Sequence, residues 1–285
     1  MSHTLVETLS RTSSSGEVSD MIGLEIIGLE SGDVAVVTLS RPEHHNALNL
    51  VGWQRIARIF EDLERNGSVR VVIVRGAGTV AFGAGADISE FPTKRLGAAA
   101  AAEYNAAISS ALQAVQRLPV PVIAMIGGLA VGGGCELAAA CDVRIASLES
   151  RFGIPIGKLG VTLGLTETRA VVGLIGAANL KYLVYGGELI DATSALAWGL
   201  VQDVVGAGEL ADAVAKLAIN ISRSSEVTVR ATKQITALAQ VPAVTEHHEL
   251  IKKITWEAYN GDDLREGVAA FLNKRTPKFT TRRRA

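Results

Sequence analysis

The sequence predicts an α/β (α+β) protein built from repeated β-β-α units and completed by a C-terminal helical region. The first observation is a recurring order: a segment rich in β-branched residues leads into a glycine-rich loop and then into a helical segment. The second is a change near residue 209, after which only helical periodicity is found. Units of this kind stack their strands into sheets with helices outside, and their loops meet at one end, where ligands usually bind.

Each element has its own signal. The segment 24–40 predicts two strands around a Ser-Gly-Asp turn. Apolar residues at helical spacing predict a helix over 50–65, which the Asn66-Gly67 pair then stops. The elements that follow are strands at 69–76, 120–128 and 142–147, helices at about 98–117 and from 135, and helical segments at 227–240 and 246–260.

Three segments divide the chain. Residues 1–20 lack an apolar signal core and contain acidic residues, so we expect a disordered N-terminal tail there. Residues 21–208 form the predicted core. Residues 209–285 form the predicted helical region, and their apolar faces favour contact with other copies of the chain.

Composition excludes several classes of function. The 28 basic and 29 acidic residues give a net charge of −1, so nucleic acid is not an expected partner. No apolar run reaches the roughly 18 residues of a membrane span. Cys135 and Cys141 are too few for a disulfide framework and fit a reducing, cytoplasmic setting as small hydrophobic residues. The adjacent histidines at 44–45 and 247–248 lack metal-site spacing, so no metal is expected.

Two glycine-rich loops carry the predicted chemistry. The sequence "GGGCE" at 132–136 flows into a helix whose first N–H groups lack partners, and "GAGAD" at 83–87 also follows a strand. Small residues let a substrate approach both backbones, and two N–H donors together would stabilise an enolate or a tetrahedral oxyanion. Glu136 lies beside the first loop as a candidate acid or base. Taken alone, it also fits an ordinary first-turn helix residue.

In combination, the loops resemble the crotonase superfamily, the enoyl-CoA hydratases and isomerases. The motifs are "AFGAGADISEF" at 81–91, the segment 119–147, "RFGIP" at 151–155, "LSRPEHHNALN" at 39–49 and the tail 266–279. The resemblance covers roughly residues 22–280. It implies a spiral of β-β-α turns, acyl-CoA thioester substrates, no separate cofactor because CoA belongs to the substrate, and trimers that often pair into hexamers through a C-terminal helical trimerisation region.

The resemblance also implies roles for individual residues. The backbone N–H groups of Ala86 and Gly133 would form the oxyanion hole, and Glu136 matches the first of two catalytic glutamates. Further binding positions implied by the motifs are Asp87, Ile88 and Ser89 in the pocket, Ala47 at the nucleotide end of CoA, and Phe271 and Lys274 in the tail that contacts CoA.

One departure from the family pattern leaves the reaction open. The second glutamate of the hydratases falls at Ile156 in this sequence. An apolar residue there would dry the pocket and raise the pKa of Glu136. Glu167, in the altered segment "LGLTETRA", could replace the missing acid if it faces the pocket. The usual interpretation of such a residue is a solvent-exposed position in the first turn of a helix. Two functions therefore remain: a hydratase or isomerase acting through a thioester enolate, or an acyl-CoA-binding protein with little or no chemistry.

Overall fold

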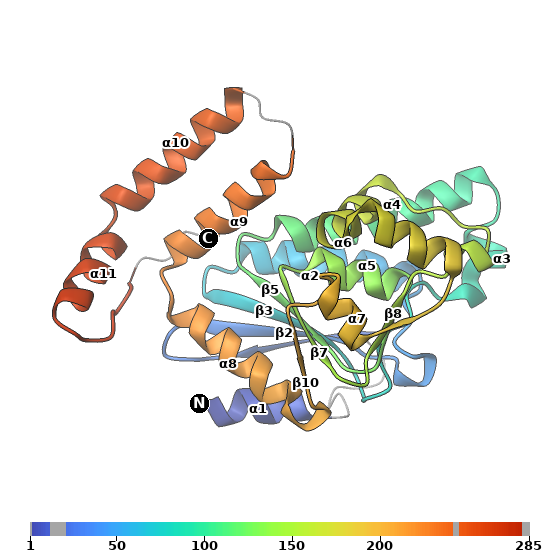
Figure 1. Cartoon of the computed structure of the whole chain (residues 1–285), viewed down its shortest axis with the longest axis horizontal. Coiled ribbons are helices and arrows are strands. Elements are labelled where there is room, and N and C mark those ends of the chain that lie inside the picture. The colour runs from blue at the N-terminus through green and yellow to red at the C-terminus, as the bar shows by residue number, and fades with distance from the viewer. Residues whose placement is uncertain (1, 12–20, 242–244, 281–285) are drawn as a thin grey trace.

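The computed structural model describes residues 2–11, 21–241 and 245–280, and its two sheets and surrounding helices confirm the α/β class (Figure 1). The strands are β1 (Ile22–Ile27), β2 (Asp33–Leu39), β3 (Val69–Gly76), β4 (Ala81–Gly83), β5 (Val122–Ile126), β6 (Leu129–Val131), β7 (Val143–Ser147), β8 (Arg151–Gly153), β9 (Ile190–Asp191) and β10 (Asp203–Val205). The α-helices are α1 (Ser2–Ser10), α2 (Leu50–Arg65), α3 (Phe91–Lys94), α4 (Ala98–Arg117), α5 (Gly133–Ala140), α6 (Leu165–Gly186), α7 (Ala192–Ala197), α8 (Leu210–Arg223), α9 (Glu226–Ala239), α10 (Thr245–Asn260) and α11 (Asp262–Leu272).

The larger sheet has the order β1-β2-β3-β5-β7-β10. Strands β1 and β2 pair antiparallel, as the predicted hairpin requires, and every other neighbouring pair is parallel. Parallel neighbours need a crossover, and in this chain the crossovers carry the helices that cover the sheet. The helix predicted over 50–65 is α2, with the same bounds and with Asn66 as its C-cap.

The smaller sheet, in the order β4-β6-β8-β9, is built from segments that the sequence presents as glycine-rich loops. Strands β4, β6 and β8 have three residues each, too short to show an alternating pattern. The three units that begin with β3, β5 and β7 each give one strand to the larger sheet, a short strand to the smaller sheet, and then one or more helices. This arrangement confirms the repeated β-β-α units.

The larger sheet is covered on both faces along β3, which explains why the middle of this strand is apolar. Along β3, Val72 and Val74 belong to the core cluster shared with α2 and α4, whereas Val71 and Ile73 belong to a second cluster beneath α1 and α8. Successive side chains of a strand point to opposite faces. A strand covered on both faces therefore favours apolar residues at successive positions, and here only the buried Arg70 and Arg75 and the terminal Gly76 interrupt the run.

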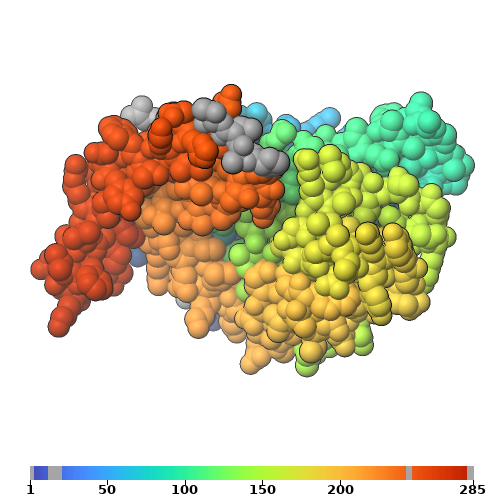
Figure 2. Space-filling model, turned by 45° about the horizontal axis from the view of Figure 1, so that its top comes forward, coloured from blue at the N-terminus to red at the C-terminus, as the bar shows by residue number. Residues whose placement is uncertain are grey.

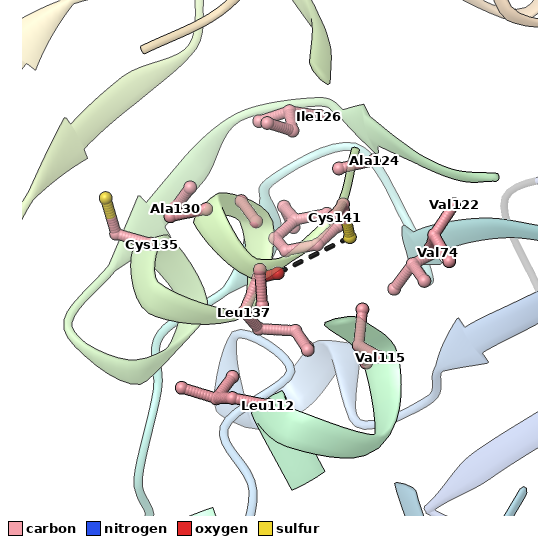
Figure 3. Packing of buried hydrophobic residues seen from close by; sticks show 14 of the residues in the cluster. Val74, Leu112, Val115, Val122, Ala124, Ile126, Ala130, Cys135, Leu137 and Cys141 are labelled. Atoms are coloured by element: carbon pink, nitrogen blue, oxygen red, sulfur yellow. Dashed lines mark hydrogen bonds between the residues drawn. The ribbon is translucent and has the colours of Figure 1, made fainter. Parts of the chain in front are cut away.

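The two cysteines lie inside the core. Both are free and buried, and the Cys141 thiol donates to the Leu137 carbonyl oxygen at 3.4 Å among aliphatic neighbours (Figure 3). Burial raises the pKa of both thiols to about 12, so neither forms a thiolate near neutral pH. They pack as small hydrophobic residues, as expected.

The N-terminus differs from the expectation of a disordered tail. Residues 2–10 form α1, which packs beside α8 on the outer face of the larger sheet (Figure 1); positions 12–20 of the expected tail lie outside the described residues. Leu5 and Leu9 are buried, and the buried Arg75 donates hydrogen bonds to the carbonyl oxygens of Thr8, Leu9 and Arg11. These contacts depend on a sheet formed far along the chain, so the local sequence carried no sign of them.

Leu5→Ala is expected to lower the free energy of unfolding by about 2 to 5 kcal/mol, because Leu5 is fully buried and its removal leaves a cavity. Urea denaturation measures the loss. Thr4→Ala, at an exposed position of the same helix, is the control and should change stability little. Equal effects of the two substitutions would show that α1 does not dock on the sheet in solution.

The region from 209 onward is helical, as predicted, but it divides into two parts. Helix α8 lies on the larger sheet, and its buried residues Leu210, Val214 and Ala218 belong to the core cluster there. Helix α9 is held to the body by the Lys233–Asp142 ion pair at 2.7 Å, whereas α10 and α11 extend away from it, in the red part of Figures 1 and 2. No helix in the described ranges is both long and apolar enough to cross a membrane.

Candidate active site

A cavity of about 120 Å³ lies where the N-terminal ends of α5 and α6 meet the loop after β4. Its walls are mostly apolar, with a few polar groups that converge on the space, which is the usual composition of a small-molecule site. The lining includes Ala86, Ile88, Arg95, Asn105, Gly133, Glu136, Ile156 and Glu167.

The Ala86 amide is available to a ligand because the backbone around it is already paired. Leu48 forms a parallel bridge with Ala86: its N–H donates to the Gly85 carbonyl at 2.7 Å, and its carbonyl accepts from the Asp87 N–H at 2.8 Å. In such a bridge the central residue turns its own N–H to the other side. Within the described residues the Ala86 N–H has no acceptor, and Ala86 lines the cavity.

Gly133 supplies the second amide as the first residue of α5, where N–H groups have no partner inside the helix. The two loops approach each other closely. A Cβ on Gly85, which has φ +86°, would lie 2.5 Å from the Gly133 nitrogen, and a Cβ on Gly134 would lie 1.9 Å from the Gly83 carbonyl oxygen. The glycines therefore allow a contact that any side chain would prevent. This contact brings the two predicted oxyanion donors into one cavity.

Glu136 lies in the first turn of α5 and is only 5% exposed. Burial, together with repulsion from Glu167, raises its pKa to about 8, against the opposing attraction of Arg95. At neutral pH Glu136 therefore keeps its proton and can act as a general acid.

Glu167 faces the same cavity from the first turn of α6, and it is 4% exposed. A solvent-exposed position is usual for a glutamate in the first turn of a helix, but Glu167 is buried. Its Oε2 atom is buried and has no hydrogen-bond partner in the described part of the chain. A buried carboxylate oxygen without a hydrogen-bond partner lowers the stability of the fold. A role of Glu167 in function would explain why such a residue lies there. Ile156, the place of the missing acid, lines the cavity as an apolar wall.

The raised pKa of Glu136 predicts a pH dependence of stability. Between its unfolded value of 4.5 and about 8, the folded protein binds a proton that the unfolded chain has released. The contribution of Glu136 to stability is therefore fully present below pH 4.5 and falls as pH rises toward about 8. Chemical denaturation at several pH values should show this slope in the wild type and a shallower one in Glu136→Gln. Identical slopes would contradict the raised pKa.

The predicted binding residues around Ala86 divide into two groups. Ile88 lines the cavity, but Asp87 and Ser89 do not. Asp87 accepts hydrogen bonds from the Ser89 hydroxyl at 2.6 Å and from Arg41 at 2.9 Å, and these interactions lower its pKa. Arg41 also donates to the Ala47 carbonyl at 2.9 Å, and Ala47 lies outside the cavity lining. These residues tie the loop that carries Ala86 to the preceding segment.

Phe271 and Lys274 lie elsewhere on the chain. Phe271 is 84% exposed on α11 and lines a second, apolar hollow of about 750 Å³ between α9, α10 and α11. Lys274 follows the end of that helix and is also exposed. Figure 1 shows α11 at the opposite end of the molecule from α5 and α6. The structure of one chain thus does not bring these residues to Glu136, and their contact with CoA stays a prediction.

The sequence interpretation missed Arg95 and Asn105, which line the cavity from the α3–α4 segment. The only sign of this role in the local sequence was that Arg95 stands between two aromatic residues, Phe91 and Tyr104. No cluster of metal-ligating side chains occurs among residues 2–11, 21–241 and 245–280.

Comparisons with known proteins show which family the chain belongs to. The sequence profile of the family described as enoyl-CoA hydratase/isomerase matches residues 30–282. A short-chain-enoyl-CoA hydratase of Clostridium acetobutylicum is 34% identical over 246 residues, covering 86% of this chain and 94% of that enzyme. A 2,3-dehydroadipyl-CoA hydratase of Escherichia coli is 33% identical over 258 residues, covering 90% and 99%.

Solved structures are equally similar. The crystal structure of an enoyl-CoA hydratase/carnithine racemase from Magnetospirillum magneticum superposes with a TM-score of 0.85 at 38% identity, covering 92% of this chain and 96% of that one. The matched region includes both glycine-rich loops, Glu136 and the helical C-terminus. The chain therefore belongs to the enoyl-CoA hydratase/isomerase family and is an acyl-CoA-processing enzyme of hydratase/isomerase type.

Proposed function

We propose that the protein adds water to the double bond of short 2-enoyl-CoA thioesters, with Glu136 and Glu167 as its two catalytic carboxyl groups. The observation that carries the proposal is the burial of both carboxyl groups in one cavity, beside the free amides of Ala86 and Gly133. Hydration needs one group to take a proton from water and another to place a proton on the α-carbon. The usual second glutamate is replaced by Ile156, which favoured a binding protein. Glu167 provides a second carboxyl group in the same cavity, which favours an enzyme.

The proposed roles follow from the electrostatics of the site. The thioester carbonyl oxygen accepts hydrogen bonds from the Ala86 and Gly133 amides, which stabilise the enolate as it forms. Glu167 accepts a proton from the water that attacks the β-carbon. Glu136, which holds a proton near neutral pH, donates it to the α-carbon. No separate cofactor enters this scheme, because CoA belongs to the substrate.

Incubation with crotonyl-CoA, followed by mass spectrometry, tests the reaction. The expected product gains the mass of one water, at a rate of about 10 per second or more, as is typical of enzymes. A product of unchanged mass from a 3-enoyl-CoA, without any hydration, would assign the site to isomerisation instead. Tight binding without turnover would assign the protein to the acyl-CoA-binding class.

The oligomer and the compartment complete the proposal. A trimer, or a pair of trimers, would cover the apolar hollow between α9, α10 and α11, where Tyr259 and Phe271 are strongly exposed. Light scattering should give three or six times the chain mass of 29.9 kDa, and a monomer would contradict this. A cytoplasmic location is supported by the two free thiols, and cell fractionation tests it.

A further inference from the structure

Arg95 is a charged group of the cavity that the proposed reaction does not use. It caps the end of α3 and lies on the wall formed by the α3–α4 segment. Its guanidinium carbon is 4.8 Å from the centre of the Phe91 ring and 5.0 Å from that of the Tyr104 ring. These two rings, 6.0 Å apart and nearly perpendicular, fix the direction of the side chain.

The donors of Arg95 are mostly free. One nitrogen donates to the Asn105 Oδ1 atom at 2.7 Å, and within the described residues the guanidinium forms no ion pair. The acids that face it are Glu136 and Glu167, and both act on it through space without a hydrogen bond. Neither carboxyl group occupies the guanidinium donors, so these stay available to a ligand. A half-buried guanidinium with unused donors is the group that proteins use to hold carboxylates in a two-point contact.

The size of the cavity suits a short acyl chain. An apolar cavity of roughly 150 Å³ holds one benzene molecule. The 120 Å³ here is therefore comparable to a short acyl group. With the thioester carbonyl at Ala86 and Gly133, the far end of such a chain stays inside the cavity that Arg95 and Asn105 line.

We propose that Arg95 and Asn105 bind a carboxylate at the end of the acyl chain remote from the thioester, so that the substrates are short 2-enoyl-CoA esters of dicarboxylic acids. The inference rests on the proposed hydration, which requires a double bond in the substrate, and on Arg95, which would bind the second carboxylate of the substrate. The guanidinium gives a planar pair of N–H donors, and the Asn105 amide adds donors from the same wall. Arg95 is then the residue that determines specificity.

The test compares two substrates of equal length. One is the six-carbon 2-enoyl-CoA that ends in a carboxylate, and the other is 2-hexenoyl-CoA, which ends in a methyl group. Wild-type protein is expected to have the higher kcat/KM for the carboxylated ester. Because a charged hydrogen-bonded contact is lost, Arg95→Met should lower the ratio of the two kcat/KM values by about 10- to 100-fold, and Arg95→Lys should lower it less. Lys94→Met removes an exposed neighbouring cation outside the cavity lining and should leave the ratio unchanged.

Two outcomes would overturn the inference while hydration stands. The first is a wild-type preference for 2-hexenoyl-CoA. The second is an equal loss for both substrates in Arg95→Met, which would make Arg95 only an electrostatic partner of the two glutamates. Calorimetric binding of adipyl-CoA and hexanoyl-CoA, which have no double bond, measures the same preference without turnover. If neither enoyl ester nor crotonyl-CoA is hydrated, the proposed function fails, and the two binding constants still decide the role of Arg95.

Discussion

Glu136→Gln is expected to lower kcat for crotonyl-CoA hydration by about 10²- to 10⁴-fold, the usual contribution of a general acid or base. Glutamine keeps the size and polarity of the side chain but cannot exchange the proton. Glu136 is neutral near pH 7, so the substitution leaves the charge of the pocket unchanged, and the affinity for CoA esters should stay within a few-fold. Steady-state kinetics with a binding measurement separates the two effects.

Glu167→Gln gives the companion test. If both carboxyl groups serve one reaction, this variant should also lose about 10²-fold or more in kcat, and the double variant should lose less than the product of the two single effects. Glu103→Gln, at an exposed position of α4, is the matched control and should retain wild-type rates. Wild-type hydration of crotonyl-CoA by Glu167→Gln would show that Glu167 is not the second catalytic carboxyl group.

Gly134→Ala is expected to reduce both activity and stability, although alanine favours helices by about 1 kcal/mol over glycine. The new Cβ would lie 1.9 Å from the Gly83 carbonyl oxygen, so the strand and the helix must separate. Overpacking of this kind typically costs 1 to about 3 kcal/mol, which exceeds the helical gain. Because the separation displaces an oxyanion donor, kcat should fall by about 10²-fold or more.

Gly173→Ala is the control for this substitution. Gly173 lies inside α6, and the nearest atom to a new Cβ is the Gln240 side-chain oxygen at 3.9 Å. Stability should stay equal or rise slightly, with activity unchanged. Denaturation and kinetics on both variants check the pair. A Gly134→Ala protein as active as Gly173→Ala would show that the close contact of the two loops is not needed for the oxyanion hole.

Local patterns in the sequence determined the main elements of the fold. The 3.6-residue period of 50–65 determined α2, and the β-branched residues of 69–76 determined a buried strand, although Arg70 and Arg75 interrupt its apolar run. The three-residue strands could not be predicted in this way, because a segment of three residues is too short to show a periodic pattern of apolar and polar side chains. Their pairing into the smaller sheet depends on neighbours from other units of the chain.

The sequence by itself determined the family, the two glycine-rich loops and the place of Glu136 in the first turn of a helix, because a helix that starts after glycines leaves its first amides without partners inside the helix wherever it lies. Only the tertiary structure decided that α1 docks on the sheet, that Glu167 is buried facing Glu136, and that Arg95 lines the same cavity. Each of these depends on contacts between residues far apart in the chain. Burial and charge at a position are set by its spatial neighbours, and local spacing does not specify them.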